Sequence, residues 1–150
     1  AAMEQKGFTA EHFSNFHPGG KLGNMLKRVD QLMHKAEALP LVACATPMTE
    51  TLVIMTQKAL GCAGIVDADG KLIGIITDGD LRRHMGPDMQ NNPASALMTK
   101  KPLTILSRAL AAEALRIMNE RRMTQLFVTN DDGKPIGLIH IHDLLRAGIA

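Results

Sequence analysis

The chain has 150 residues, of which 45% are apolar, and a formal net charge of +2. It contains no run of about 18 apolar residues, so the sequence predicts no membrane-spanning segment. The small charge and the lack of Trp and Tyr argue against nucleic acid as a partner, because single-strand binders stack bases on aromatic rings. Cys44 and Cys62 form no Cys-x-x-Cys motif and no signal peptide is visible, so we expect free thiols and a cytoplasmic location.

The first elements that the pattern predicts are a short helix at 29–35 and a strand at 40–42. Thr46 is the predicted cap of the next helix, since Pro47 suits the first helical position, where a missing N–H does no harm. Gly61 is expected to end that helix.

The second half of the chain repeats the first. Residues 54–83 and 117–146, aligned at a constant offset of 63, are identical at eleven of thirty positions without a gap. Each copy has the pattern of a helix, an apolar strand (63–66 or 126–129), an Asp-Gly turn, a second strand and a second helix. The main helix of the second copy is predicted to start near Ser107. A lone repeat of about 60 residues would be marginally stable, so we expect the two copies to share a core.

A polar motif follows the second strand of the first copy. Thr77 and Asp80 lie where a strand gives way to a helix, so their hydroxyl and carboxylate would share one rim and could bind a ribose diol. Unpaired N–H groups at such a helix start favour anions. Thr-x-x-Asp is also a helix capping box, which needs no ligand.

The repeated unit, with its Thr-x-x-Asp motif, resembles a pair of CBS domains, the tandem nucleotide-sensing module. The resemblance implies an α/β fold of two β-α-β-β-α repeats related by pseudo-two-fold symmetry, with their sheets face to face. We divide the chain into a linker at 1–30, a first CBS repeat at 31–92 and a second at 93–150. In that family the Thr-x-x-Asp motif holds the ribose and phosphate of a nucleotide, which implies this role for Thr77 and Asp80.

The expected cleft lies between the copies, and in the second copy His140 replaces the hydroxyl residue while Asp143 is retained. The first-copy cleft is therefore favoured. Arg83 or Arg82 is the candidate partner of a phosphate. Two histidines and a carboxylate at 140–143 also fit a zinc or nickel site, which ranks below ligand contact, and a polar rim with no ligand ranks above both. The remaining predicted lining residues are Leu41, Val42, Cys62, Ala63 and Gly64.

A second resemblance covers the region before the repeats. Gly7-Phe8-Thr9, the His-Pro-Gly-Gly loop that begins at His17, and Leu32-Met33-His34 are similar to the junction of the arabinose-5-phosphate isomerase family, in which a sugar-isomerase (SIS) domain precedes a CBS pair. His17 would be the counterpart of an active-site histidine there. The resemblance implies that the chain is the C-terminal part of such an isomerase, which converts ribulose 5-phosphate to arabinose 5-phosphate for the Kdo sugar of lipopolysaccharide.

Three functions compete at this point. The favoured one is a regulatory module that senses AMP, ATP or a nucleotide sugar such as CMP-Kdo. The second is a structural module with an empty cleft that joins isomerase domains, with a dimer of this chain and a tetramer of the parent. The third, an enzyme in its own right, ranks lowest because no base–nucleophile pair or paired carboxylates are apparent. We expect no catalytic residue, metal or resident cofactor.

Overall fold

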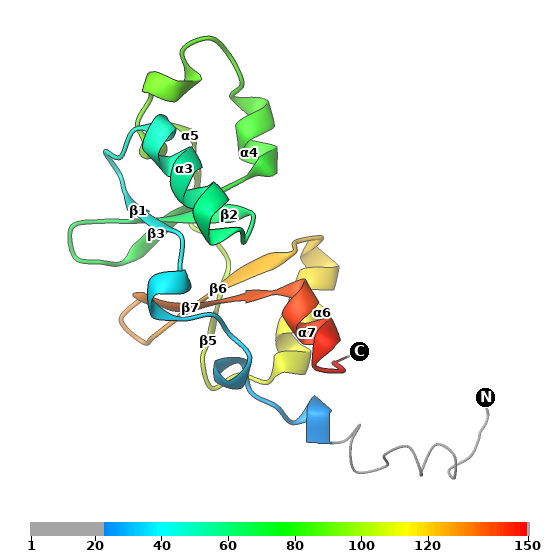
Figure 1. Ribbon diagram of the computed structural model, residues 1–150. Helices are drawn as coiled ribbons and strands as arrows, with labels where there is room; N and C mark the ends of the chain where they lie inside the picture. The colour runs from blue at the N-terminus through cyan, green and yellow to red at the C-terminus, as the bar shows by residue number, and fades with distance from the viewer. Residues whose placement is uncertain (1–22, 150) are drawn as a thin grey trace.

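The computed structural model describes residues 23–149 and has the predicted α/β architecture, with two repeats that each carry a small sheet (Figure 1). The first sheet has the order β1-β2-β3-β4 and the second the order β5-β6-β7. In each, the first two strands are parallel and the next pair is an antiparallel hairpin. The strands are β1 (Leu41–Ala43), β2 (Cys62–Val66), β3 (Leu72–Thr77), β4 (Thr99–Lys100), β5 (Thr104–Leu106), β6 (Gln125–Thr129) and β7 (Pro135–His140).

Helices connect the parallel strands and follow each hairpin. The long helices α3 and α6 provide the crossovers β1–β2 and β5–β6, and the short α4 and α7 come directly after β3 and β7. The helices are α3 (Met48–Lys58), α4 (Asp78–Arg83), α5 (Ala94–Leu97), α6 (Ala111–Arg121) and α7 (Ile141–Arg146), with 3-10 turns η1 (Val29–Gln31), η2 (Ala36–Ala38) and η3 (Met89–Asn91). None of the helices between residues 23 and 149 has the length and apolar character needed to cross a membrane.

Two predicted helix starts were wrong. Thr46 does not cap α3, because Pro47 is the N-cap residue and the Thr46 hydroxyl accepts a hydrogen bond from the Ala43 N–H at 3.1 Å. The second-copy helix α6 begins at Ala111, four residues after Ser107, with Leu110 as its N-cap residue and no side-chain cap. A capping residue predicts a boundary only where its side chain turns toward the helix, and the Thr46 hydroxyl bonds to β1 instead.

The predicted helix at 29–35 was also wrong, and so was the predicted end of α3. The segment contains only η1, after which His34 pairs with Leu138 of β7 as an isolated antiparallel bridge. Helix α3 ends at Lys58, because Ala59 adopts a left-handed conformation with φ of 56° two residues before Gly61.

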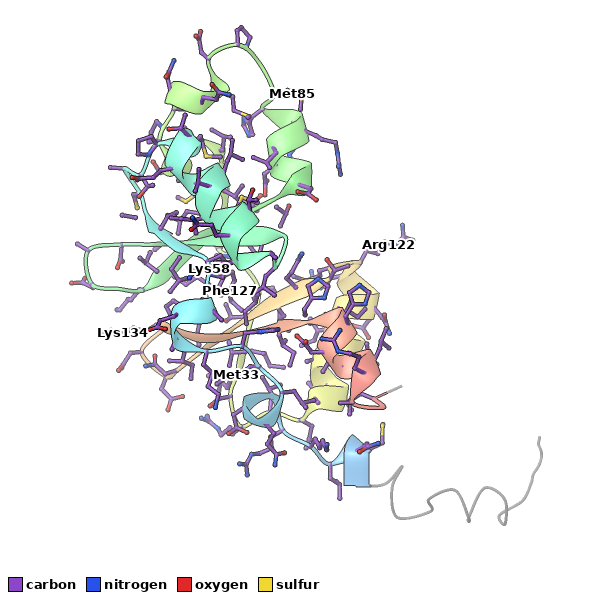
Figure 2. The ribbon with its side chains drawn as sticks, viewed as in Figure 1. Met33, Lys58, Met85, Arg122, Phe127 and Lys134 are labelled. Atoms are coloured by element: carbon purple, nitrogen blue, oxygen red, sulfur yellow. The ribbon has the colours of Figure 1, made fainter. Side chains whose placement is uncertain are left out.

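The two sheets pack on each other through apolar side chains. Cys62, Phe127 and Leu138 are fully buried there, and Phe127 lies between the repeats in Figure 2. Gly64 provides the space, since a Cβ atom at this position would lie 2.7 Å from Cζ of Phe127. This shared layer lies beside a separate core in each repeat, which explains why two copies form one stable unit.

Each sheet is completed by the segment that precedes the first strand of the other repeat. β4, which leads into the second repeat, pairs with β3 of the first, with Thr99 opposite Ile75. His34, which leads into the first repeat, pairs with Leu138 of the second. The repeats are thus linked by backbone pairing as well as by the shared apolar layer.

Candidate functional site

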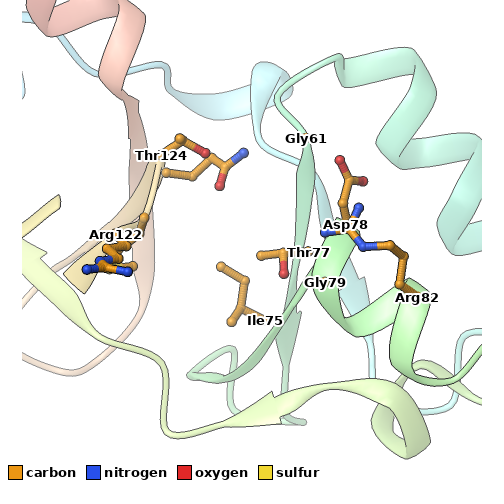
Figure 3. A pocket seen from close by; sticks show the side chains of 10 residues that line it. Gly61, Ile75, Thr77, Asp78, Gly79, Arg82, Arg122 and Thr124 are labelled. Atoms are coloured by element: carbon orange, nitrogen blue, oxygen red, sulfur yellow. The ribbon is translucent and has the colours of Figure 1, made fainter. Parts of the chain in front are cut away.

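A cavity of about 340 Å³ lies where the end of β3 and the start of α4 face the loop between α6 and β6. Figure 3 shows Thr77, Asp78 and Arg82 on one side and Arg122 and Thr124 on the other, so both repeats contribute to it. The full lining is Gly61, Ile75, Thr77, Asp78, Gly79, Arg82, Arg122, Met123, Thr124 and Gln125.

Thr77 is one of the predicted site residues that line this cavity. It ends β3 in an extended conformation and is the N-cap residue of α4. Its N–H and hydroxyl donate to Oδ2 of Asp80 at 2.9 and 3.2 Å, so the capping box that the motif permitted is present. Both side chains of the motif are therefore held in place before any ligand arrives.

Asp80 does not line the cavity and is only 2% exposed. The Thr99 hydroxyl donates to its Oδ1 at 2.6 Å, and the Arg83 guanidinium contacts the same oxygen. Burial opposes ionisation of Asp80, but the hydrogen bonds from Thr99 and Thr77 and the charge of Arg83 outweigh it and lower the pKa of the carboxyl. A ligand hydroxyl would reach Asp80 only by displacing one of these donors.

The other predicted lining residues of the first copy lie on two different faces of its sheet. Leu41, Cys62 and Gly64 pack in the layer between the sheets. Val42 and Ala63 alternate with them and point into the first repeat's own core. Burial, with a smaller effect of the Asp78 charge, raises the pKa of the Cys62 thiol to about 12.

The sequence reasoning missed the loop between α6 and β6. Arg122 and Thr124 come from this loop, and Gln125, the first residue of β6, donates from Nε2 to the Leu60 carbonyl of the first repeat at 3.0 Å. A signal was available, because pseudo-two-fold symmetry brings the helix start of one copy beside the helix–strand loop of the other. Arg82, offered with Arg83 as a phosphate partner, lines the cavity, whereas Arg83 binds Asp80.

The cavity's two arginines have no counterparts in the other copy. At the offset of 63, Arg82 corresponds to Leu145 and Arg122 to Ala59. The carboxylate of Asp78 is the acidic group in the lining, so the cavity has an excess of one positive charge. The equivalent position on the second copy lacks both guanidiniums and the Thr77 hydroxyl.

The second-copy rim is built from histidines. His140 is the N-cap residue of α7, and its Nδ1 accepts the His142 N–H at 3.1 Å. Asp143 Oδ2 accepts the His140 N–H at 3.0 Å and lies 2.9 Å from His34 Nε2, while Arg146 contacts Oδ1 at 2.7 Å. Among residues 23–149 no group of three or more His, Cys, Asp or Glu side chains is arranged to hold a metal ion. His17 lies outside these residues.

The CBS domain family matches residues 29–86 and 94–150, and the chain belongs to that family as a pair of CBS domains. It is 45% identical over 152 aligned positions to arabinose 5-phosphate isomerase KdsD of Pseudomonas aeruginosa, covering 99% of this chain and 47% of the relative. KdsD of Escherichia coli K12 is 40% identical over 152 positions, with coverage of 99% and 46%. The chain thus spans about half the length of the curated relatives that it matches.

Solved structures share the fold at low sequence identity. CBSX2 of Arabidopsis thaliana in complex with AMP has a TM-score of 0.70 at 23% identity, over 81% of this chain and 95% of that chain. The CBS domain pair of protein MJ0100, in complex with 5′-methylthioadenosine and S-adenosyl-L-methionine, has a TM-score of 0.72 at 20% identity, over 81% and 94%. These similarities establish the fold.

Proposed function

We propose that this CBS pair is a regulatory module that binds one anionic nucleotide or nucleotide sugar, in a protein whose isomerase activity resides outside the chain. The observation that carries the proposal is the pair of arginines, Arg82 and Arg122, contributed to one cavity by opposite repeats beside the Thr77 hydroxyl. The ligands of CBSX2 and MJ0100 support a nucleoside-containing ligand. AMP, ATP and CMP-Kdo remain the candidates.

The cavity chemistry defines what such a ligand must offer. A guanidinium presents a planar set of donors that matches phosphate and carboxylate, so Arg82 and Arg122 favour a ligand with one or more anionic groups. Ile75 and Met123 provide apolar surface for a base. Thr77 and Thr124 supply hydroxyls for a sugar. Because the arginines belong to one cavity, we expect one ligand per chain.

Calorimetric titration of this chain with AMP, ATP, CMP and CMP-Kdo tests the proposal. Arg122→Ala should weaken binding by about ten-fold or more, because a hydrogen bond to a charged group contributes roughly 1.5–3 kcal/mol. Arg121→Ala is the matched control, since Arg121 is an exposed neighbour at the end of α6 and does not line the cavity. Failure of all four ligands to bind, or equal losses in both variants, would contradict the proposed site.

The relatives are named arabinose 5-phosphate isomerase, which supports a parent protein with this activity. In line with the resemblance found in the sequence, we propose that the parent converts ribulose 5-phosphate to arabinose 5-phosphate for Kdo and lipopolysaccharide synthesis in the cytoplasm. We place the two regulatory repeats at 31–92 and 93–150 and assign the catalysis to a sugar-isomerase domain beyond this chain. The purified chain should therefore not isomerise ribulose 5-phosphate. Turnover that follows the protein through chromatography would contradict the assignment of catalysis to a domain beyond this chain.

Self-association is the second candidate function, and the outer face of α3 favours it. Leu52 and Val53 line a shallow apolar groove there, and Val53 is 53% exposed. The corresponding face of α6 is instead covered by ion pairs from Arg116 to Glu113 and Glu120. We expect a homodimer by light scattering, and Val53→Lys should favour the monomer. A wild-type monomer at micromolar concentration would count against this role.

A further inference from the structure

The segment before the first repeat is docked on the second repeat. We call residues 29–34 the junction segment. The Val29 N–H donates to the Ala109 carbonyl at 2.8 Å, and His34 exchanges backbone hydrogen bonds with Leu138 at 2.8 and 3.0 Å. The His34 side chain adds the contact between Nε2 and Oδ2 of Asp143 at 2.9 Å. The junction is therefore attached to β7 by its backbone and to α7 by one imidazole.

The first repeat contains the same contact with a different donor. Thr99 pairs with β3 as His34 pairs with β7, and its hydroxyl donates to Asp80 as the imidazole of His34 contacts Asp143. The hydroxyl donor does not titrate, whereas an imidazole changes charge near neutral pH. The second repeat thus makes with an imidazole donor the contact to a carboxylate that the first repeat makes with a hydroxyl donor.

His140, the N-cap residue of α7, is a second histidine next to this contact. Its Nδ1 accepts the His142 N–H, which requires that this nitrogen carry no proton, and the two rings stack with centroids 4.9 Å apart. Thr77 holds the same position in the first repeat. A proton on His140 Nδ1 would abolish the cap and put a positive charge at the start of a helix, where the dipole is unfavourable.

The surrounding charges oppose that proton. The groups that face His140 are His34, His142, Asp143 and Arg146, and Arg146 is already paired with the single carboxylate. Burial and the neighbouring His142 lower the pKa of His140, and they outweigh the attraction of Asp143. A proton on His140 therefore removes the cap of the same helix, α7, that carries the Asp143 carboxylate contacted by His34.

We propose that His140, Asp143 and His34 form an acid-opened latch, in which protonation of the His140 cap loosens α7 and releases the junction segment from the second repeat. The latch is closed when His140 is neutral. It acts on the segment that enters the repeat pair, and it is independent of a nucleotide in the cavity at Thr77.

Hydrogen-exchange mass spectrometry of the whole chain between pH 7.5 and 5.5, corrected for intrinsic exchange, tests the latch. Protection of the junction segment should fall as the pH drops, by up to about ten-fold per pH unit, the slope of a one-proton linkage. His140→Thr restores the first repeat's residue and should make the protection independent of pH. Peptides over β4 serve as the internal control, since Thr99 and Thr77 do not titrate.

Several results of this experiment would contradict the latch. A flat wild-type profile, an equal fall in His140→Thr, or an equal fall in β4 would overturn the latch, the last because it would indicate global acid unfolding. If His140→Thr does not fold, nitrogen-detected NMR of the wild type gives a separate test. Neutral His140 must carry its proton on Nε2, and its titration must coincide with the change in the junction amides. A proton on Nδ1 at pH 7.5 would overturn the proposal.

Discussion

The hydroxyl of Thr99 donates a hydrogen bond to the buried carboxylate of Asp80 at 2.6 Å. This contact joins the connector between the repeats to the motif at which a ligand is expected, and it has no signature in the local sequence. It also makes Asp80 a structural residue, whatever its role toward a ligand.

Thr99→Val should therefore destabilise the chain by roughly 1–3 kcal/mol, because at nearly unchanged volume it removes one of the two donors to Oδ1 of the buried Asp80 carboxylate and leaves only Arg83. Urea denaturation followed by circular dichroism measures the change. Thr99→Ser keeps the hydroxyl and is the matched control. Equal stability of the valine variant and the wild type would show that the bond contributes nothing.

The lowered pKa of Asp80 predicts acid sensitivity. Burial raises this pKa, but the hydrogen bonds from Thr99 and Thr77 and the charge of Arg83 have the larger effect, so the net shift is downward. The folded state then binds fewer protons than the unfolded chain, so the stabilisation is present above the unfolded value of about 4 and is lost as the pH falls through the folded value. Between pH 7 and pH 3, the urea midpoint of unfolding should fall less steeply in Asp80→Asn than in the wild type. Parallel curves would assign the acid loss to other carboxyl groups.

Gly64→Ala should be destabilising by roughly 1–3 kcal/mol, the usual cost of overpacking. The new Cβ would lie 2.7 Å from Phe127 and 3.0 Å from side-chain atoms of Leu41 and Leu72. Gly79→Ala is the matched control, because its nearest atoms are 3.6 and 3.7 Å away and alanine favours helix. Thermal melting compares the two variants. A neutral Gly64→Ala would mean that the sheets separate readily.

The two cysteines should differ in reactivity. Cys62 is fully buried, and burial followed by the Asp78 charge raises its pKa to about 12, so its thiol stays protonated at pH 8. Cys44 is partly exposed. Iodoacetamide should alkylate Cys44 in the native protein and Cys62 only after unfolding, as peptide mass spectrometry would show. Native labelling of Cys62 at the rate of Cys44 would indicate that the layer between the sheets opens.

The sequence by itself determined the fold class and the repeats. Residues 54–83 and 117–146 share a periodic apolar pattern and fixed turn residues, and such local patterns survive in the sequence because each repeat needs them. The family follows from the same positions. Helix boundaries that depend on contacts with other parts of the chain were harder to predict from the sequence. The start of α6 at Ala111, later than predicted, is an example.

Only the tertiary structure decided which side chains meet. Arg122 faces Thr77 across one cavity, and His34 reaches Asp143 from 109 residues away, because each repeat packs against, and completes the sheet of, the other. Thr77 was found from the sequence since its motif is local. The alternation of β1 and β2 likewise placed Val42 and Ala63 in a core, away from the cavity. Neighbours across a pseudo-two-fold interface are set by the three-dimensional packing of the copies, which no local pattern encodes.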